Sequence, residues 1–308
     1  MKKIFAVIMS LVVAAALLSA CSGSGSSASG GAIELTDMLG REIKLDAPAE
    51  KIVALTASDC EILYAIGAGD TVIGRGEYCD YPAEVLEIES VQSGYETNIE
   101  QIIALGPQVV LMDSMAQSSE GVDALEAAGI TVVVNDAADI EGVYTSIEII
   151  GEVTGKNDEA KALIDSMKSE FEELEELASS KSISDDDNDI YFEVSPLEYG
   201  LWAAGNGSFM NEVADMIGLD NIFEDMDAWA EVSEEQVIER DPDYIVTIAM
   251  YFGEGPTPEE EILSRSGWEN VSAVENDKIF DLQNNELSRP GPRLVDGAKA
   301  LYEFVYGE

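Results

Sequence analysis

The sequence contains no histidine among its 308 residues. Because the side chain that these sites require is absent, a Ser-His-Asp triad, a histidine-ligated zinc and a histidine-ligated haem are all excluded. An enzyme would depend on carboxylates alone, and the one local pair that stands out, Asp80 and Glu84, is equally well explained as solvated surface. We therefore expect no enzymatic activity and no metal ion held by the protein's own side chains.

Basic residues are also scarce, with 16 lysines and arginines against 62 aspartates and glutamates. Nucleic-acid binding depends on patches of Lys and Arg that replace counterions, so we expect no nucleic-acid partner. With 46% hydrophobic residues the chain has enough apolar material for about two ordinary domains.

Cysteine is nearly absent, and the first of three cysteines follows an export signal. Lys2 and Lys3 precede an apolar run, residues 4–18, that is short for a membrane span, and Leu-Ser-Ala-Cys at 18–21 resembles a bacterial lipobox. The resemblance implies a signal peptide over residues 1–20, lipidation of Cys21 and a flexible Ser/Gly tether over 21–32. The alternative is an uncleaved signal anchor. We expect a mature protein outside the cytoplasm, anchored to the cell membrane by its lipid.

Cys60 and Cys79 are the other two cysteines. They could form a disulfide in an oxidising compartment, but the sequence does not establish that they approach each other.

Two internal matches indicate duplication. "EILYAIG", residues 61–67, and "EVADMIG", residues 212–218, each place a glutamate six residues before a glycine, with apolar residues at helical spacing. "IEQIIALGPQ" from Ile99 and "EEQVIERDPD" from Glu234 each combine Glu-Gln with a helical turn that a proline ends before a strand. The matches occur in the same order, which predicts two lobes of related topology.

Short apolar runs separated by helical stretches predict an α/β fold with mainly parallel sheets. A hairpin over 33–45 and a final helix beyond Pro292 complete the pattern. We expect an N-terminal lobe over 33–155, an interlobe helix over 156–182 and a C-terminal lobe over 183–308. The predicted strands are Ile52–Leu55, Val109–Met112, Thr131–Val134, Ile190–Val194, Tyr244–Ile248 and Lys278–Leu282.

Residues 157–181 contain neither glycine nor proline, and their apolar residues recur at spacings of three and four. They predict one amphipathic helix about 37 Å long, which would connect the lobes as a stiff spine.

Taken together, the lipobox, the repeated helices, the long helix, "YCDYPAEV" at 78–85 and "SRPGPRLVDGAKAL" at 288–301 resemble the substrate-binding proteins of ABC importers for iron chelates and cobalamin. The resemblance spans nearly all of residues 33–308. It implies two α/β lobes, joined by a rigid helix in the manner of class III periplasmic binding proteins, with a ligand held in the cleft between them. The implied partners are a permease dimer and its ATPase, and the protein itself is expected to be a monomer.

The resemblance also implies residue roles. In that family a surface glutamate on each lobe docks into arginines of the permease, and the positions matched to these are Glu61 and Glu212. For Glu61 the alternative is a capping box with Ser58 as N-cap. The ligand-binding positions implied are Tyr78, Tyr81, Tyr95, Trp202, Trp229 and Arg289.

Stacked aromatic faces with a few fixed polar groups suit a flat ligand that carries its own iron or cobalt, such as a corrinoid or a ferric siderophore. The tryptophans could instead belong to the core. Tyr95 occupies a position where some haem-binding relatives place a ligating tyrosinate, so a haem-binding protein of the same fold stays open. A sensor or scaffold without a permease is the other alternative.

Overall fold

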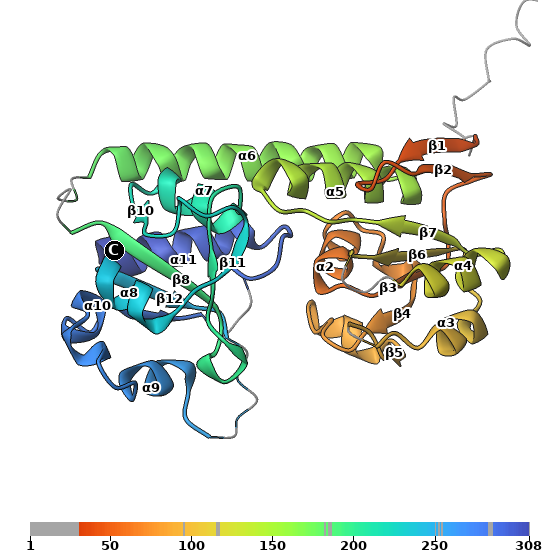
Figure 1. Cartoon of the computed structure of the whole chain (residues 1–308). Coiled ribbons are helices and arrows are strands. Elements are labelled where there is room, and N and C mark those ends of the chain that lie inside the picture. Colours follow the sequence, from red (N-terminus) through yellow and green to blue (C-terminus); the bar gives the residue numbers. More distant parts are fainter. Residues whose placement is uncertain are drawn as a thin grey trace, which may run out of the picture. The chain divides into compact units, whose positions relative to one another are not determined.

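The computed structural model describes residues 31–94, 96–114, 118–181, 183, 187–249, 251, 253, 255–282 and 286–307 (Figure 1). The chain divides into Met1–Gly31 and a compact unit, Ala32–Glu308, which holds both lobes. Cys21 and Tyr95 lie outside the described residues. Within the described ranges, no helix combines the length and the hydropathy that a membrane span requires.

The N-terminal lobe is built on a five-stranded parallel sheet in the order β5-β4-β3-β6-β7. Alternate residues of its strands face opposite sides: Ile52 and Ala54 pack with α2 and α5, whereas Val53 and Leu55 pack with α3 and α4. The antiparallel hairpin of β1 and β2 adjoins α5. The elements are β1 Ile33–Thr36, β2 Glu42–Leu45, β3 Ile52–Ala54, α2 Ala57–Ala65, η1 Gly69–Thr71, β4 Val72–Gly76, η2 Ala83–Glu87, β5 Ser90–Val91, α3 Ile99–Leu105, β6 Val109–Met112, α4 Ser119–Ala127, β7 Thr131–Val134 and α5 Ile140–Thr154.

The C-terminal lobe has a six-stranded mixed sheet in the order β11-β9-β8-β12-β13, with β10 pairing β8. Here Ile190 and Phe192 face α7 and α11, while Tyr191 and Ile245 face α8, α9 and α10. The elements are β8 Asp189–Ser195, η3 Leu197–Tyr199, β9 Trp202–Ala204, α7 Phe209–Met216, β10 Asp220–Asn221, β11 Trp229–Glu231, α8 Glu234–Arg240, β12 Tyr244–Thr247, α9 Pro258–Leu263, η4 Trp268–Asn270, α10 Ser272–Glu275, β13 Ile279–Asp281 and α11 Leu294–Tyr306.

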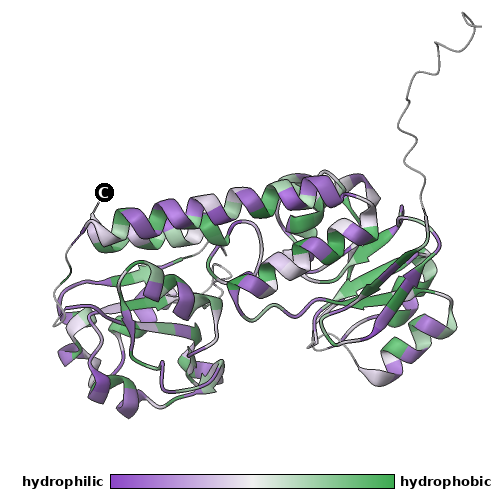
Figure 2. Cartoon of the chain, turned by 90° about the horizontal axis from the view of Figure 1, so that it is seen from above, coloured by the Kyte–Doolittle hydropathy of each residue, from purple (hydrophilic) through white to green (hydrophobic). Residues whose placement is uncertain are grey.

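Helix α6, Asn157–Ser179, runs along both lobes and alternates hydrophilic and hydrophobic residues over its length (Figures 1 and 2). It packs on α5 of the first lobe and on α7 and α11 of the second. Its buried residues join one continuous hydrophobic cluster that reaches from Ile43 in the hairpin to Leu301 in α11. The expected α/β fold of two similar lobes joined by one long helix is confirmed.

Candidate functional site

The helix that carries Glu61 is capped two residues earlier than the sequence predicted. Thr56 is the N-cap of α2, and its hydroxyl oxygen accepts a hydrogen bond from the Asp59 backbone N–H at 3.2 Å. The capping box with Ser58 as N-cap is therefore wrong. The reason is that Thr56 and Asp59 satisfy the end of the helix, since Thr56 Oγ1 also donates to Asp59 Oδ2 at 2.6 Å.

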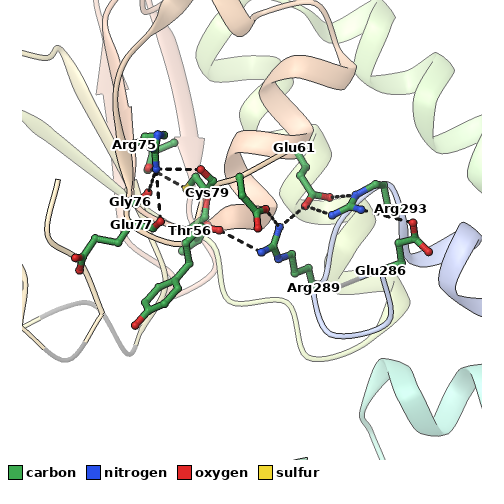
Figure 3. Close-up of polar contacts among 12 residues, drawn as sticks. Thr56, Glu61, Arg75, Gly76, Glu77, Cys79, Glu286, Arg289 and Arg293 are labelled. Atoms are coloured by element: carbon green, nitrogen blue, oxygen red, sulfur yellow. Dashed lines mark hydrogen bonds and ion pairs between the residues drawn. The ribbon is translucent and has the colours of Figure 1, made fainter. Parts of the chain in front are cut away.

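Glu61 is buried, with 3% of the residue exposed. Its carboxylate accepts hydrogen bonds from two arginines of the C-terminal lobe (Figure 3). Arg293 binds both oxygens, Nε to Oε2 at 3.0 Å and Nη2 to Oε1 at 2.7 Å, and Arg289 Nη1 lies 3.0 Å from Oε1. The expectation that Glu61 presents a free carboxylate to a permease is therefore wrong, because both oxygens bind arginines of the same chain.

Glu212, the counterpart of Glu61 in the second lobe, also reaches across to the other lobe. It is half-buried in α7, and its Oε2 accepts the backbone N–H of Ile140, the first residue of α5, at 2.7 Å. Burial raises the pKa of the Glu212 carboxyl, the Ile140 hydrogen bond opposes that shift, and the nearby carboxylates of Asp139 and Asp215 add to it. Nearby, Phe209 N–H donates to Ala138 O at 2.8 Å. The two repeated glutamates thus make reciprocal contacts between the lobes.

Arg289 was predicted to contact ligand, but the structure engages it with three groups of the N-terminal lobe. Besides Glu61, it donates to Asp80 Oδ1 at 2.6 Å and to the Tyr78 carbonyl oxygen at 3.1 Å. Burial alone would lower the pKa of this guanidinium, yet the hydrogen bonds to Asp80 and Glu61 raise it, so the side chain stays charged. Arg293 binds Glu61 and also lies 3.6 Å from Glu286.

Tyr78 and Tyr81 are exposed, at 52% and 46%, in the segment that follows β4. The Arg293 guanidinium stacks over the Tyr81 ring, 4.0 Å from its centroid. The structure thus places both tyrosines on the N-terminal lobe beside a contact with the C-terminal lobe.

Trp202 and Trp229, the two tryptophans implied to bind ligand, are strand residues. They lie in the paired strands β9 and β11, in a register that sets Trp202 opposite Glu231 and Trp229 opposite Ala204. Opposed residues share a face, as do residues two apart, so both tryptophans lie on one face of the sheet. They are 39% and 38% exposed, which excludes a core role. Trp229 packs edge-on against Phe209, with ring centroids 5.6 Å apart.

Glu100 and Glu235 are two exposed carboxylates to which the sequence analysis assigned no role. Each is the second residue of its helix, α3 or α8, and the N-cap side chains Asn98 and Ser233 each accept the N–H of the glutamine that follows the glutamate. The hydrogen bond with its own backbone N–H lowers the pKa of the exposed Glu235 carboxyl, and the Ser233 hydroxyl adds to that shift. The sequence shows that the two glutamates are equivalent, because each precedes the glutamine in the second pair of matched stretches.

Cys60 and Cys79 are buried free thiols. The hydrogen bond between the two thiols is the largest cause of the raised pKa of Cys60, and burial adds to it. In the part of the chain that the structure describes, no three Cys, Asp or Glu side chains are grouped to hold a metal ion. The described part of the chain has a surface pocket of about 500 Å³ between the hairpin and α5, and another of about 440 Å³ near the end of α6. Neither pocket is lined by a predicted ligand-binding residue.

Comparison with known proteins identifies the family of this chain. Residues 52–286 match the model of a family described as "Periplasmic binding protein". The chain belongs to that family. It is 33% identical to the ABC transporter substrate-binding lipoprotein YvrC of Bacillus subtilis, over 99% of this chain and 98% of that protein.

Two further relatives in this family have named ligands. The vitamin B12-binding protein of Vibrio cholerae is 26% identical, over 84% of this chain and 90% of its own. The crystal structure of an ABC-type Fe3+-hydroxamate transport system from Saccharomonospora viridis superposes with a TM-score of 0.74 at 26% identity, covering 89% of this chain and 98% of that one. These likenesses span both lobes.

Proposed function

We propose that this protein is the solute-binding component of an ABC importer, which captures a corrinoid or a ferric siderophore between its lobes and delivers it to a permease. Near-complete alignment with the lipoprotein YvrC supports the transporter role, and likeness to B12- and Fe3+-hydroxamate-associated proteins supports the ligand class. In this account the ligand brings its own cobalt or iron, the protein performs no catalysis, and the monomer acts from a lipid anchor on Cys21 outside the cytoplasm.

The observation that carries the ligand proposal is the pair of exposed aromatic groups, one on each lobe, that adjoin contacts between the lobes. Tyr81 lies against Arg293 of the other lobe. Trp229 packs on Phe209, whose N–H binds Ala138 of the other lobe. Exposed aromatic faces on both sides of a lobe boundary suit a flat, extended ligand, because each face buries a large apolar area against it.

For docking we propose Glu100 and Glu235 in place of Glu61 and Glu212. Both are exposed, and they occupy the same helix position in matched repeats, one on each lobe. Two equivalent carboxylates offer a two-fold permease one contact per half and so fix the orientation of the complex. Glu61 and Glu212 are instead committed to contacts within the protein.

The ligand proposal is tested by titrating the soluble protein, residues 22–308, with cobalamin, haem, a ferric hydroxamate and a ferric catecholate while following tryptophan fluorescence, corrected for absorption by the coloured ligand. We expect saturable, equimolar binding of cobalamin or a siderophore. Haem as the only binder would favour the haem alternative, and no saturable binding by any of the four would reject the proposal.

Docking is tested by uptake of the bound ligand in cells that carry Glu100→Lys with Glu235→Lys. The matched control is Glu120→Lys with Glu239→Lys, which changes the net charge equally at exposed positions of α4 and α8. We expect uptake to fall about tenfold or more in the first pair only, as for lost charge pairs at an interface. Normal uptake in both pairs, with ligand binding intact, would reject docking through Glu100 and Glu235, and uptake that persists in cells without the protein would favour a sensor or scaffold role.

A further inference from the structure

We propose that Arg289 and Arg293 of the C-terminal lobe are positioning residues that, with Glu61 as their shared buried counter-ion, hold the Tyr78–Tyr81 segment of the N-terminal lobe in its ligand-binding arrangement. This proposal rests on the proposed function in one respect only, which is that Tyr78 and Tyr81 contact ligand. The positioning itself can be measured without any ligand.

The segment is held by arginines from both lobes (Figure 3). Arg75, in β4 of the same lobe, donates to the carbonyl oxygens of Gly76 at 3.2 Å and Cys79 at 3.1 Å. Arg289 comes from the other lobe and binds the Tyr78 carbonyl and the Asp80 carboxylate. Backbone and side-chain groups between residues 76 and 80 are therefore fixed from two directions.

Arg293 fixes the end of the segment through the ring of Tyr81. Its guanidinium lies 4.0 Å from the ring centroid while two of its nitrogens bind Glu61. Because the carboxylate holds the plane of the guanidinium, the guanidinium limits the orientations open to the tyrosine ring. Glu61 thus acts on Tyr81 through Arg293 and on Tyr78 through Arg289.

Arginine, and not lysine, suits this role. Arg289 serves Glu61, Asp80 and the Tyr78 carbonyl at once through Nη1 and Nη2. A lysine at this position keeps the charge but offers one nitrogen on a flexible stem, so it cannot hold the same three partners in one plane. Arg289→Lys therefore separates positioning from charge.

The loop that carries both arginines sits directly on the start of α2. A Cβ added to Gly291, between them, would lie 3.7 Å from Glu61 Oε2 and 3.7 Å from Ser58 Cα, which is ordinary contact. Glu61 and Arg289 are 228 residues apart in the chain, so this contact exists only when the two lobes are together. The arrangement of Tyr78 and Tyr81 is consequently coupled to the association of the lobes.

The experiment compares wild-type protein with Arg289→Lys, Arg289→Met and Arg293→Lys. Arg240→Lys is the matched control, because Arg240 also forms a paired hydrogen bond with a carboxylate, Asp225, and lies 4.6 Å from the centroid of an aromatic ring, Phe223, but within one lobe. Amide hydrogen exchange over residues 76–82 is measured by mass spectrometry without ligand, and residues 131–134 in β7 report on the global stability of the lobe.

We expect exchange over 76–82 to rise about tenfold more than exchange over β7 in all three test variants, as for a lost charge-assisted hydrogen bond, while the Arg240→Lys protein shows no such difference. For a ligand that wild-type protein binds, affinity should fall by a similar factor in Arg289→Lys and Arg289→Met alike.

Exchange over 76–82 equal to that of wild type would overturn the proposal. The proposal would also be overturned if exchange in Arg289→Lys matched wild type while exchange in Arg289→Met was faster. Positive charge alone would then be sufficient to hold the segment. Faster exchange in a protein that binds none of the ligands would reject the proposed ligand and leave the positioning intact.

Discussion

Glu61 and Arg293, 232 residues apart in the chain, form a two-point ion pair that joins the lobes, with nitrogen–oxygen distances of 3.0 and 2.7 Å. The side chains are 2% and 13% exposed. A buried carboxylate of this kind is stable only with its partners in place, because ionised groups lose their hydration on burial. The pair therefore links the stability of the protein to the contact between its lobes.

The first prediction concerns this pair. Glu61→Gln keeps the shape of the side chain but leaves Arg289 and Arg293 without their common counter-charge, so the free energy of unfolding should fall by about 3 kcal/mol. Urea denaturation monitored by circular dichroism measures the loss. Glu212→Gln, which keeps an oxygen to accept the Ile140 N–H, serves as the comparison and should lose about 1 kcal/mol or less. Equal losses in the two variants would contradict the assignment of Glu61 as the counter-ion.

The second prediction concerns Asp59, which is 1% exposed. Burial raises the pKa of its carboxyl from 3.8 to about 6, although hydrogen bonds from Thr56 and Asn135 oppose the shift. The folded state therefore favours the protonated form. The stability that the protonated Asp59 carboxyl contributes is complete below pH 3.8 and is lost as the pH rises to about 6. Above that pH the buried, ionised carboxylate lowers the free energy of unfolding by about 3 kcal/mol.

Asp59→Asn removes that cost. The amide can still accept from Asn135 Nδ2, now 2.8 Å from Asp59 Oδ1, and can donate to Thr56 Oγ1 in place of the present bond. At pH 7 the variant should be more stable than wild type by about 3 kcal/mol, and the difference should shrink toward zero as the pH falls to 4. Thermal denaturation across this range measures it. A difference that does not vary with pH would show that Asp59 does not titrate as described.

The third prediction concerns Gly205, which follows the strand of Trp202. A Cβ there would lie 2.2 Å from the carbonyl oxygen of Met226, a backbone atom that cannot turn away. Gly205→Ala should therefore destabilise the protein by about 3 kcal/mol or more. Gly291→Ala is the control, since its Cβ meets only ordinary contacts at 3.7 Å. Denaturation midpoints of the two variants give the comparison, and similar midpoints would contradict the steric explanation.

Elements with strong local signals could be predicted from the sequence. β6 and β7 have the predicted ends, Val109–Met112 and Thr131–Val134, because continuous runs of β-branched and aliphatic residues bounded by turns leave little choice. β4, "VIGRG", was not predicted, because two glycines and an arginine give it little local strand signal. Its pairing with β3 stabilises it instead. The matched stretches were visible because their internal spacing is the same in both halves of the chain.

The contacts of the candidate site could not be predicted in the same way. Nothing local to "EILYAIG" indicates that Glu61 binds arginines more than two hundred residues away. The family resemblance predicted the family and the fold class correctly. It implied that Glu61 and Glu212, which lead the first pair of matched stretches, lie at the surface. The structure instead exposes Glu100 and Glu235 of the second pair, because the N-termini of α3 and α8 lie at the surface. Burial depends on the packing of whole helices, which spacing alone does not determine.

The central claim is that one ligand is held by aromatic side chains from both lobes. Calorimetric titration of the ligand that binds, with Tyr78→Ala from the N-terminal lobe and Trp229→Ala from the C-terminal lobe, tests it most directly. Leu86→Ala, another exposed apolar residue of the first lobe, is the control. We predict that each aromatic variant weakens binding about tenfold or more, as stacked rings contribute about 1–3 kcal/mol each, and that Leu86→Ala changes nothing. Wild-type affinity in either aromatic variant would contradict a site shared between the lobes.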